Sequence, residues 1–165
     1  MMQSRSFLLV CLGNICRSPL AEAALRAAAA RAGVVIEVDS AGTGAWHVGN
    51  PPDTRSQAVA LAHGIDISDY RARQVAAADY RRFTDILALD RDNLAELRRR
   101  APKDATARIA LLMDAVSDRK GQAVADPYYG DAAGFEVTWA DVAAAAEAIV
   151  AGLRADRRSS ASGNP

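Results

Sequence analysis

Four short apolar runs, alternating with helical and turn-forming segments, constrain the fold of this 165-residue chain most strongly. They cover residues 7–10, 34–39, 85–90 and 108–113. Their interiors are almost continuously apolar, which is typical of strands buried on both faces of a parallel sheet. Alternation of such strands with helices predicts an α/β fold with a central parallel sheet and helices on both faces.

The intervening segments carry helix start and stop signals. Ser18-Pro19 suits a helix start, with Ser18 as the N-cap. Thr54-x-x-Gln57 has the capping-box pattern of a second helix. The predicted helices cover residues 19–32, 54–64, 93–100 and 135–153, and residues 114–134 are predicted to form a long loop. The chain is therefore expected to form one domain over residues 1–154, with a flexible polar tail at 155–165.

Composition narrows the class of protein. Twenty basic residues balance twenty acidic ones, which disfavours a general nucleic-acid binder. No apolar run reaches transmembrane length. Near the N-terminus, the apolar run at residues 7–10 is too short to form the core of a signal peptide. We therefore expect a cytoplasmic protein with no membrane partner, although export without a signal peptide stays open. Two histidines and two cysteines offer neither a histidine-rich metal site nor a disulfide framework.

The chemistry concentrates in the loop between the first strand and the first helix. Its sequence is Cys11-Leu12-Gly13-Asn14-Ile15-Cys16-Arg17-Ser18. The free N–H groups and dipole of a helix N-terminus favour an anion there, and Gly13 can adopt the positive φ that turns backbone amides inward. Arg17 adds a planar fork for two phosphate oxygens, and the same field favours a thiolate at Cys11. The loop therefore predicts nucleophilic attack on phosphorus, giving a phosphocysteine.

A second group is needed to protonate the leaving oxygen and later to activate water. One carboxyl group can do both, and Asp126, in the segment Asp-Pro-Tyr-Tyr-Gly, is the candidate. A cysteine and an arginine six residues apart are a weak signal alone. The same pair becomes a specific signal when it lies between a strand and a helix and Asp126 follows downstream.

With these residues in place, the sequence resembles the low-molecular-weight protein tyrosine phosphatases over nearly its whole length. The resemblance is greater to eukaryotic members and their bacterial counterparts than to the polysaccharide-linked bacterial branch. The segments that carry it are CLGNICRSPLAEA (11–23), DSAGTGAWHVGNPPD (39–53), HGIDIS (63–68), ARQ (72–74) and DPYYGD (126–131).

The resemblance implies a flavodoxin-like fold with a central four-stranded parallel sheet, and an enzyme that needs no cofactor or metal. It implies that Cys11 is the nucleophile, that Arg17 binds phosphate and that Asp126 is the general acid. Leu12, Gly13, Asn14, Ile15, Cys16 and Ser18 would complete the phosphate-binding loop, and Ser18 would assist the leaving thiolate. Ser40 would support the loop, and Trp46, Tyr128 and Tyr129 would wall the substrate cleft.

Two positions qualify the resemblance. Family members that act on phosphoarginine tend to carry Thr where this chain has Ile15, so Ile15 favours phosphotyrosine. Asp69-Tyr70 stands where many members carry a histidine that supports the loop.

Several alternatives stay open at this level. Cys16 is either a small core residue or the partner of Cys11 in a reversible disulfide that protects the nucleophile. Tyr128 and Tyr129 could themselves be phosphorylated. Other functions on the same fold are arsenate reductase, disfavoured because no cysteine follows Cys16, protein arginine phosphatase, and a silent phosphate-binding module. The expected partners are phosphotyrosine proteins and oxyanions, and the expected state is a monomer or weak homodimer.

Overall fold

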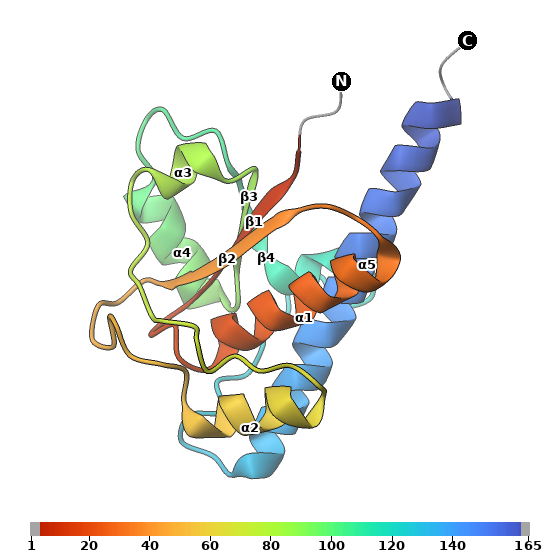
Figure 1. Cartoon of the computed structure of the whole chain (residues 1–165). Helices are drawn as coiled ribbons and strands as arrows, with labels where there is room; N and C mark the ends of the chain where they lie inside the picture. Colours follow the sequence, from red (N-terminus) through yellow and green to blue (C-terminus); the bar gives the residue numbers. More distant parts are fainter. Residues whose placement is uncertain (1–3, 163–165) are drawn as a thin grey trace.

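The computed structural model describes residues 4–162, with side chains described up to residue 157. Four parallel strands form one sheet in the order β2-β1-β3-β4 (Figure 1). The strands are β1 (Ser6–Cys11), β2 (Glu37–Gly42), β3 (Asp85–Ala88) and β4 (Arg108–Leu111). The helices are α1 (Arg17–Ala32), α2 (Thr54–Ala62), α3 (Asp79–Arg82), α4 (Arg91–Arg100), the 3₁₀ turn η1 (Leu112–Ala115) and α5 (Ala132–Ser162). This confirms the predicted α/β class and the flavodoxin-like, four-stranded parallel sheet.

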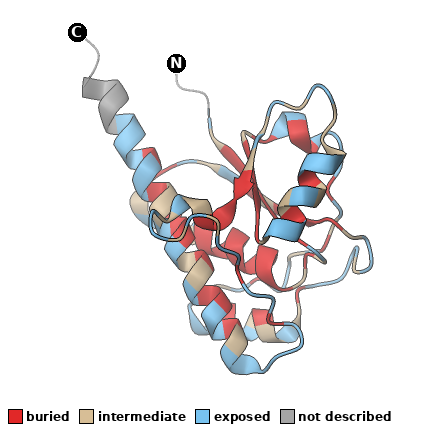
Figure 2. Cartoon of the chain, turned by 180° about the vertical axis from the view of Figure 1, so that it is seen from behind, coloured by how far each residue is buried: buried red, intermediate tan, exposed pale blue. Residues whose placement is uncertain are grey.

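Strand β1 lies inside the sheet and separates two hydrophobic cores. Phe7, Leu9 and Cys11 pack into the core shared with α1, α2 and α5. Leu8 and Val10 face the opposite core, against α3 and α4. Successive side chains of a strand point to opposite faces, so a run that is apolar at every position is buried on both sides. Figure 2 shows the sheet buried between the two helical layers.

The predicted strands all exist, but their bounds differ. The second strand begins at Glu37 rather than at residue 34, and the fourth ends at Leu111 because η1 follows it. The short helix α3 was not predicted, because four residues carry too little periodicity to detect.

Two predicted helix caps are wrong. Helix α1 begins at Arg17, and the hydroxyl of Ser18 contacts Cys11 instead of capping the helix. Helix α2 is capped by Asp53, whose carboxylate accepts a hydrogen bond from the backbone N–H of Arg55. Asp is as good an N-cap as Ser or Thr, and here it lies one residue earlier.

The last helix is longer than predicted. Helix α5 spans Ala132–Ser162, so its end lies beyond the predicted end at residue 153 and beyond the predicted domain boundary at 154. Residues 155–162 are therefore helical, whereas residues 163–165 lie outside the described chain. Between residues 4 and 162, no helix combines the length and apolar character needed to cross a membrane.

Candidate active site

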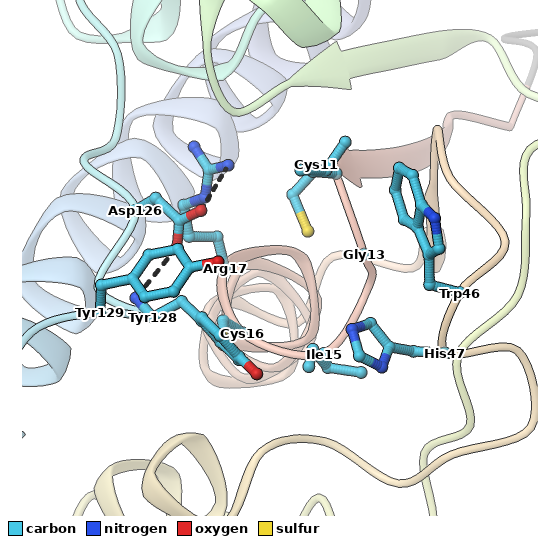
Figure 3. Close-up of a pocket in the computed structure, with 11 residues that line it drawn as sticks. Cys11, Gly13, Ile15, Cys16, Arg17, Trp46, His47, Asp126, Tyr128 and Tyr129 are labelled. Atoms are coloured by element: carbon cyan, nitrogen blue, oxygen red, sulfur yellow. Dashed lines mark hydrogen bonds and ion pairs between the residues drawn. The ribbon is translucent and has the colours of Figure 1, made fainter.

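A pocket of about 290 Å³ opens at the carboxyl end of β1. In doubly wound α/β folds ligands bind at this edge, where the strand order changes direction. Figure 3 shows the thiol of Cys11 between Asp126 and the two tyrosines on one side and Trp46 and His47 on the other. The lining residues are Cys11, Leu12, Gly13, Ile15, Cys16, Arg17, Trp46, His47, Asp126, Tyr128 and Tyr129.

Cys11 is the last residue of β1 and is buried. Its sulfur lies 3.0 Å from Ser18 Oγ and accepts a hydrogen bond from the backbone N–H of Asn14 at 3.3 Å. Ser18 Oγ accepts a hydrogen bond from Asn14 Nδ2 at 2.7 Å, which leaves its own O–H free to point at the sulfur. Two hydrogen-bond donors therefore converge on the Cys11 sulfur.

Asn14 stabilises the conformation of the loop. It has a φ of 59°, the left-handed conformation that the sequence assigned to Gly13, and asparagine tolerates it better than most residues. Its side chain donates to Ser40 Oγ at 3.0 Å as well as to Ser18, and accepts from the backbone N–H of Arg73 at 3.0 Å. Ser40, which the sequence predicts to support the loop, contacts Asn14 directly.

Replacing Asn14 with alanine is expected to lower the free energy of unfolding by about 2–3 kcal/mol and to weaken phosphate binding. The change removes two buried hydrogen bonds and one that is partly buried, and it places a residue with a Cβ, but no compensating side chain, at positive φ. Urea unfolding and inhibition by inorganic phosphate measure the two effects. Asn14→Gly is the matched control, since it keeps the backbone conformation and loses only the side chain. An unchanged stability and phosphate affinity in both variants would contradict the role of Asn14.

A buried carboxylate extends this network. Glu22 accepts a hydrogen bond from Ser40 Oγ at 2.6 Å and pairs with Arg26 at 2.9 Å. Burial raises the pKa of Glu22, against the opposing contacts from Ser40 and Arg26. Tyr70 lies at this cluster. Burial raises the pKa of Tyr70 to about 12, and the charge of Glu22 acts in the same direction.

Two hydrogen-bond acceptors fix one nitrogen of the Arg17 guanidinium. Its Nη1 donates to Asp90 Oδ2 at 2.7 Å and to the carbonyl of Val124 at 2.9 Å. Its Nη2 lies 3.7 Å from Asp126 Oδ2 (Figure 3). The guanidinium is almost wholly buried yet lines the pocket: Nη1 is fixed by Asp90 and Val124, and Nη2 lies toward Asp126.

Asp126 and the aromatic residues form the mouth of the pocket. The Asp126 side chain is 45% exposed, and its Oδ1 accepts a hydrogen bond from the backbone N–H of Tyr128 at 3.0 Å. Tyr129 and Trp46 are 95% and 72% exposed, which leaves their rings free to contact a ligand. The structure thus brings together all three predicted catalytic residues and the three predicted wall residues, and adds His47, whose ring packs over Gly13.

On its other side, the loop packs closely against the backbone at the end of β2. Thr43 N donates to the carbonyl of Cys11, and Gly44 N donates to that of Leu12. A Cβ on Gly42 would lie 2.7 Å from the carbonyl oxygen of Leu12. Glycine is therefore required at position 42.

Cys16 and Cys11 are both free and buried in this structure. Burial raises the pKa of the Cys16 thiol to about 12, and the charges of Asp53, Cys11 and Asp126 add to the effect. Cys16 therefore stays a neutral thiol beside a reactive one.

Sequence reasoning missed several residues that shape the site. Asp90, Arg73 and Glu22 act through Arg17, Asn14 and Ser40 and come from distant parts of the chain. Only Asp90 had a usable signal, since it directly follows a buried strand at the sheet edge that binds ligands. No group of three or more His, Cys, Asp or Glu side chains within the described part of the chain could hold a metal ion.

A strand that ends in a buried cysteine, an anion-binding loop closed by arginine and a facing aspartate define a cysteine-dependent phosphatase. Comparison with known proteins agrees. A sequence model of the family described as low molecular weight phosphotyrosine protein phosphatase matches residues 6–159. The chain therefore belongs to the low molecular weight phosphotyrosine protein phosphatase family.

Individual relatives cover most of the chain. Low molecular weight phosphotyrosine protein phosphatase 1 of Drosophila melanogaster is 40% identical over 148 residues, which are 88% of this chain and 95% of the relative. Low molecular weight protein-tyrosine-phosphatase YfkJ of Bacillus subtilis is 46% identical over 126 residues, 75% of this chain and 81% of the relative. A crystal structure of protein tyrosine phosphatase from Entamoeba histolytica, with Hepes in the active site, superposes with a TM-score of 0.86 at 34% identity, covering 93% of this chain and 99% of that one.

Proposed function

We propose that this enzyme hydrolyses phosphotyrosine in proteins, and aryl phosphates generally, through a phosphocysteine formed on Cys11. The observation that carries the proposal is the convergence of Cys11, Arg17 and Asp126 on one pocket. Family membership supports the reaction class, and the residue roles below are our assignment.

In the first step the Cys11 thiolate attacks phosphorus. The S–P bond forms as the bond from phosphorus to the aryl oxygen breaks, and protonated Asp126 gives its proton to that oxygen. The Nη2 of Arg17, which donates to neither Asp90 nor Val124, and the backbone N–H groups of the loop bind the phosphoryl oxygens. Because they are fixed before the substrate arrives, they stabilise the transition state without reorganising.

In the second step water replaces the thiolate. Asp126, now a carboxylate, accepts a proton from the attacking water as the P–O bond forms and the S–P bond breaks. The Ser18 hydroxyl, 3.0 Å from the sulfur, stabilises the departing thiolate by a hydrogen bond. Inorganic phosphate then leaves, and Asp126 is protonated again.

The cleft supports an aromatic phosphate ester as substrate. Trp46, Tyr128 and Tyr129 supply flat apolar walls on opposite sides of the pocket, which suit a phenyl ring. The partners are phosphotyrosine proteins, with free phosphate and other oxyanions bound in the same loop. We infer a cytoplasmic monomer or weak homodimer that binds neither nucleic acid nor membrane. The balanced charge of the chain supports the inference that it does not bind nucleic acid.

The test is hydrolysis of para-nitrophenyl phosphate and a phosphotyrosine peptide in the presence of EDTA. Turnover of both, unaffected by the chelator, is the expected result. Phosphoarginine and arsenate with thioredoxin are the comparison substrates. Faster turnover of either would reverse the ranking of functions, and no turnover by the folded protein would favour a binding module.

Replacing Asp126 with asparagine is expected to lower kcat/KM for phenyl phosphate by about 10²-fold. Asparagine keeps the shape of the side chain but cannot donate a carboxylic proton to the leaving oxygen. The loss should shrink for 2,4-dinitrophenyl phosphate, whose leaving group needs no proton. Equal losses on the two esters would exclude Asp126 as the general acid.

A further inference from the structure

The segment that carries Asp126 is fixed to the domain at its beginning. Val124 N donates to the carbonyl of Leu89 at 2.8 Å, and the Val124 carbonyl accepts from Arg17. The next carbonyl, of Ala125, accepts a longer hydrogen bond from Thr138 Oγ1 at 3.5 Å. Beyond this point the chain turns outward over residues 126–131, which we call the acid loop.

Arg55, at the start of α2, holds the far half of the acid loop. Its Nη2 donates to the carbonyl of Tyr128 at 2.9 Å and its Nη1 to the carbonyl of Gly130 at 3.2 Å. Its Cζ also lies over the rings of Tyr128 and Phe135, at 5.6 and 4.6 Å from their centroids. In the part of the chain that the structure describes, Arg55 is the one side chain outside the acid loop that donates to its backbone carbonyls.

The same guanidinium is tied to the phosphate-binding loop through Asp53. Arg55 pairs with both carboxylate oxygens of Asp53, at 3.0 and 2.9 Å. The contact to Arg55 lowers the pKa of Asp53, so the pair stays charged near neutral pH. The backbone N–H of Asp53 in turn donates to the carbonyl of Ile15 at 2.8 Å. One chain of contacts thus runs from Ile15 through Asp53 and Arg55 to Tyr128.

The orientation of Asp126 depends on the end of that chain. One carboxylate oxygen accepts from Tyr128 N, and the other lies 3.7 Å from Arg17, too long for a hydrogen bond. The backbone of Tyr128, which Arg55 holds at its carbonyl, is therefore the close contact that aims the carboxyl group.

We propose that Arg55 is a positioning residue: its guanidinium holds the acid loop against the phosphate-binding loop, so that Asp126 faces the leaving oxygen. This inference rests on the proposed role of Asp126 as general acid. Arg55 touches neither the phosphate nor the reacting atoms. Losing it should therefore impair the protonation of the leaving group and spare phosphate binding.

The alternative is that Arg55 only stabilises the start of α2. That role would lower stability, and with it all activities to the same degree. The effect of the leaving group separates these two roles. Only a displaced general acid lowers the rate for esters with poor leaving groups more than the rate for esters with good ones.

The experiment compares Arg55→Met with wild type on two esters. We expect kcat/KM for phenyl phosphate to fall by about tenfold or more, since a displacement of about 1 Å in a catalytic group can cost up to about 10²-fold. The loss for 2,4-dinitrophenyl phosphate should stay within about twofold, and inhibition by inorganic phosphate should not change. Equal losses on both esters, or weaker phosphate binding in proportion to lost activity, would overturn the proposal.

Arg81→Met is the matched control. It removes an exposed arginine–aspartate pair, with Asp104, on α3, away from the pocket, and should leave both rates unchanged. Arg55→Lys is the second variant, and it carries the test if Arg55→Met unfolds. Lysine keeps the charge beside Asp53 but cannot hold Asp53 and both carbonyls at once, so the same selective loss is expected.

A double variant separates failure of this inference from failure of the proposed function. In the Asp126→Asn background there is no acid left to position, so Arg55→Met should add less than about twofold on phenyl phosphate. Additive losses would show that Arg55 acts by another route. If Asp126→Asn alone shows no preference between the esters, the acid assignment fails, and the positioning role fails with it.

Discussion

Replacing Cys11 with serine is expected to lower turnover of para-nitrophenyl phosphate by about 10⁴-fold or more while the fold is kept. The Ser18 and Asn14 donors that converge on the sulfur stabilise a thiolate, whereas a serine hydroxyl does not ionise near neutral pH. The shorter side chain also retracts the nucleophilic atom from phosphorus. Steady-state rates of the purified variant measure the loss.

Two further measurements make the Cys11→Ser result specific. Rapid acid quenching with a ³²P-labelled substrate should trap a phosphoenzyme in wild type and none in the variant. Thermal unfolding should remain cooperative, because the change removes no large apolar group from the core. Activity within tenfold of wild type would refute covalent catalysis by Cys11.

Replacing Arg17 with lysine is expected to cost about 10³-fold in kcat/KM and to weaken inhibition by inorganic phosphate. Arg17 Nη1 donates to Asp90 and Val124, which leaves Nη2 for the proposed phosphate contact. A single ammonium placed near Asp90 cannot also make a planar, two-point contact with phosphate. The loss should therefore appear in both binding and the chemical step.

Asp90→Asn tests how Arg17 is held. It keeps an oxygen near Nη1 but removes the charge, so we expect kcat/KM to fall, but by less than in Arg17→Lys. Arg17→Lys with phosphate affinity equal to wild type would contradict the assignment of Arg17 as the phosphate ligand.

Local signals were enough to predict the sheet and the nucleophilic loop. Residues 7–18 hold a buried strand, a loop and a helix start in immediate succession, so their arrangement follows from short-range rules. Asp126 was also within reach, because a proton donor is required by the chemistry and the acid sits in a distinctive Pro-Tyr-Tyr context. Side chains that act directly on substrate tend to carry such signals.

The residues that hold these groups could not be predicted in the same way. Arg73 reaches Asn14 and Arg55 reaches Tyr128 across long stretches of sequence, and an arginine on a predicted surface looks the same whether it binds a carbonyl or water. The positive φ at position 14 was assigned to Gly13, because both residue types tolerate it and only the surrounding hydrogen bonds decide between them. The end of α5 was misplaced, because the exposed polar residues 154–157 continue the helix beyond Leu153.

The order of the parts along the chain has a consequence for synthesis of the protein on the ribosome. The proposed nucleophile lies at residue 11, whereas the proposed acid follows β4 and precedes the final helix. Helix α5 also supplies the apolar side chains, among them Phe135 and Trp139, that cover α1. A nascent chain whose α5 is still inside the ribosome therefore leaves the apolar face of α1 uncovered. Cys11 is therefore synthesised early, whereas the proposed phosphoester cleavage has to wait until the acid loop and α5 have emerged.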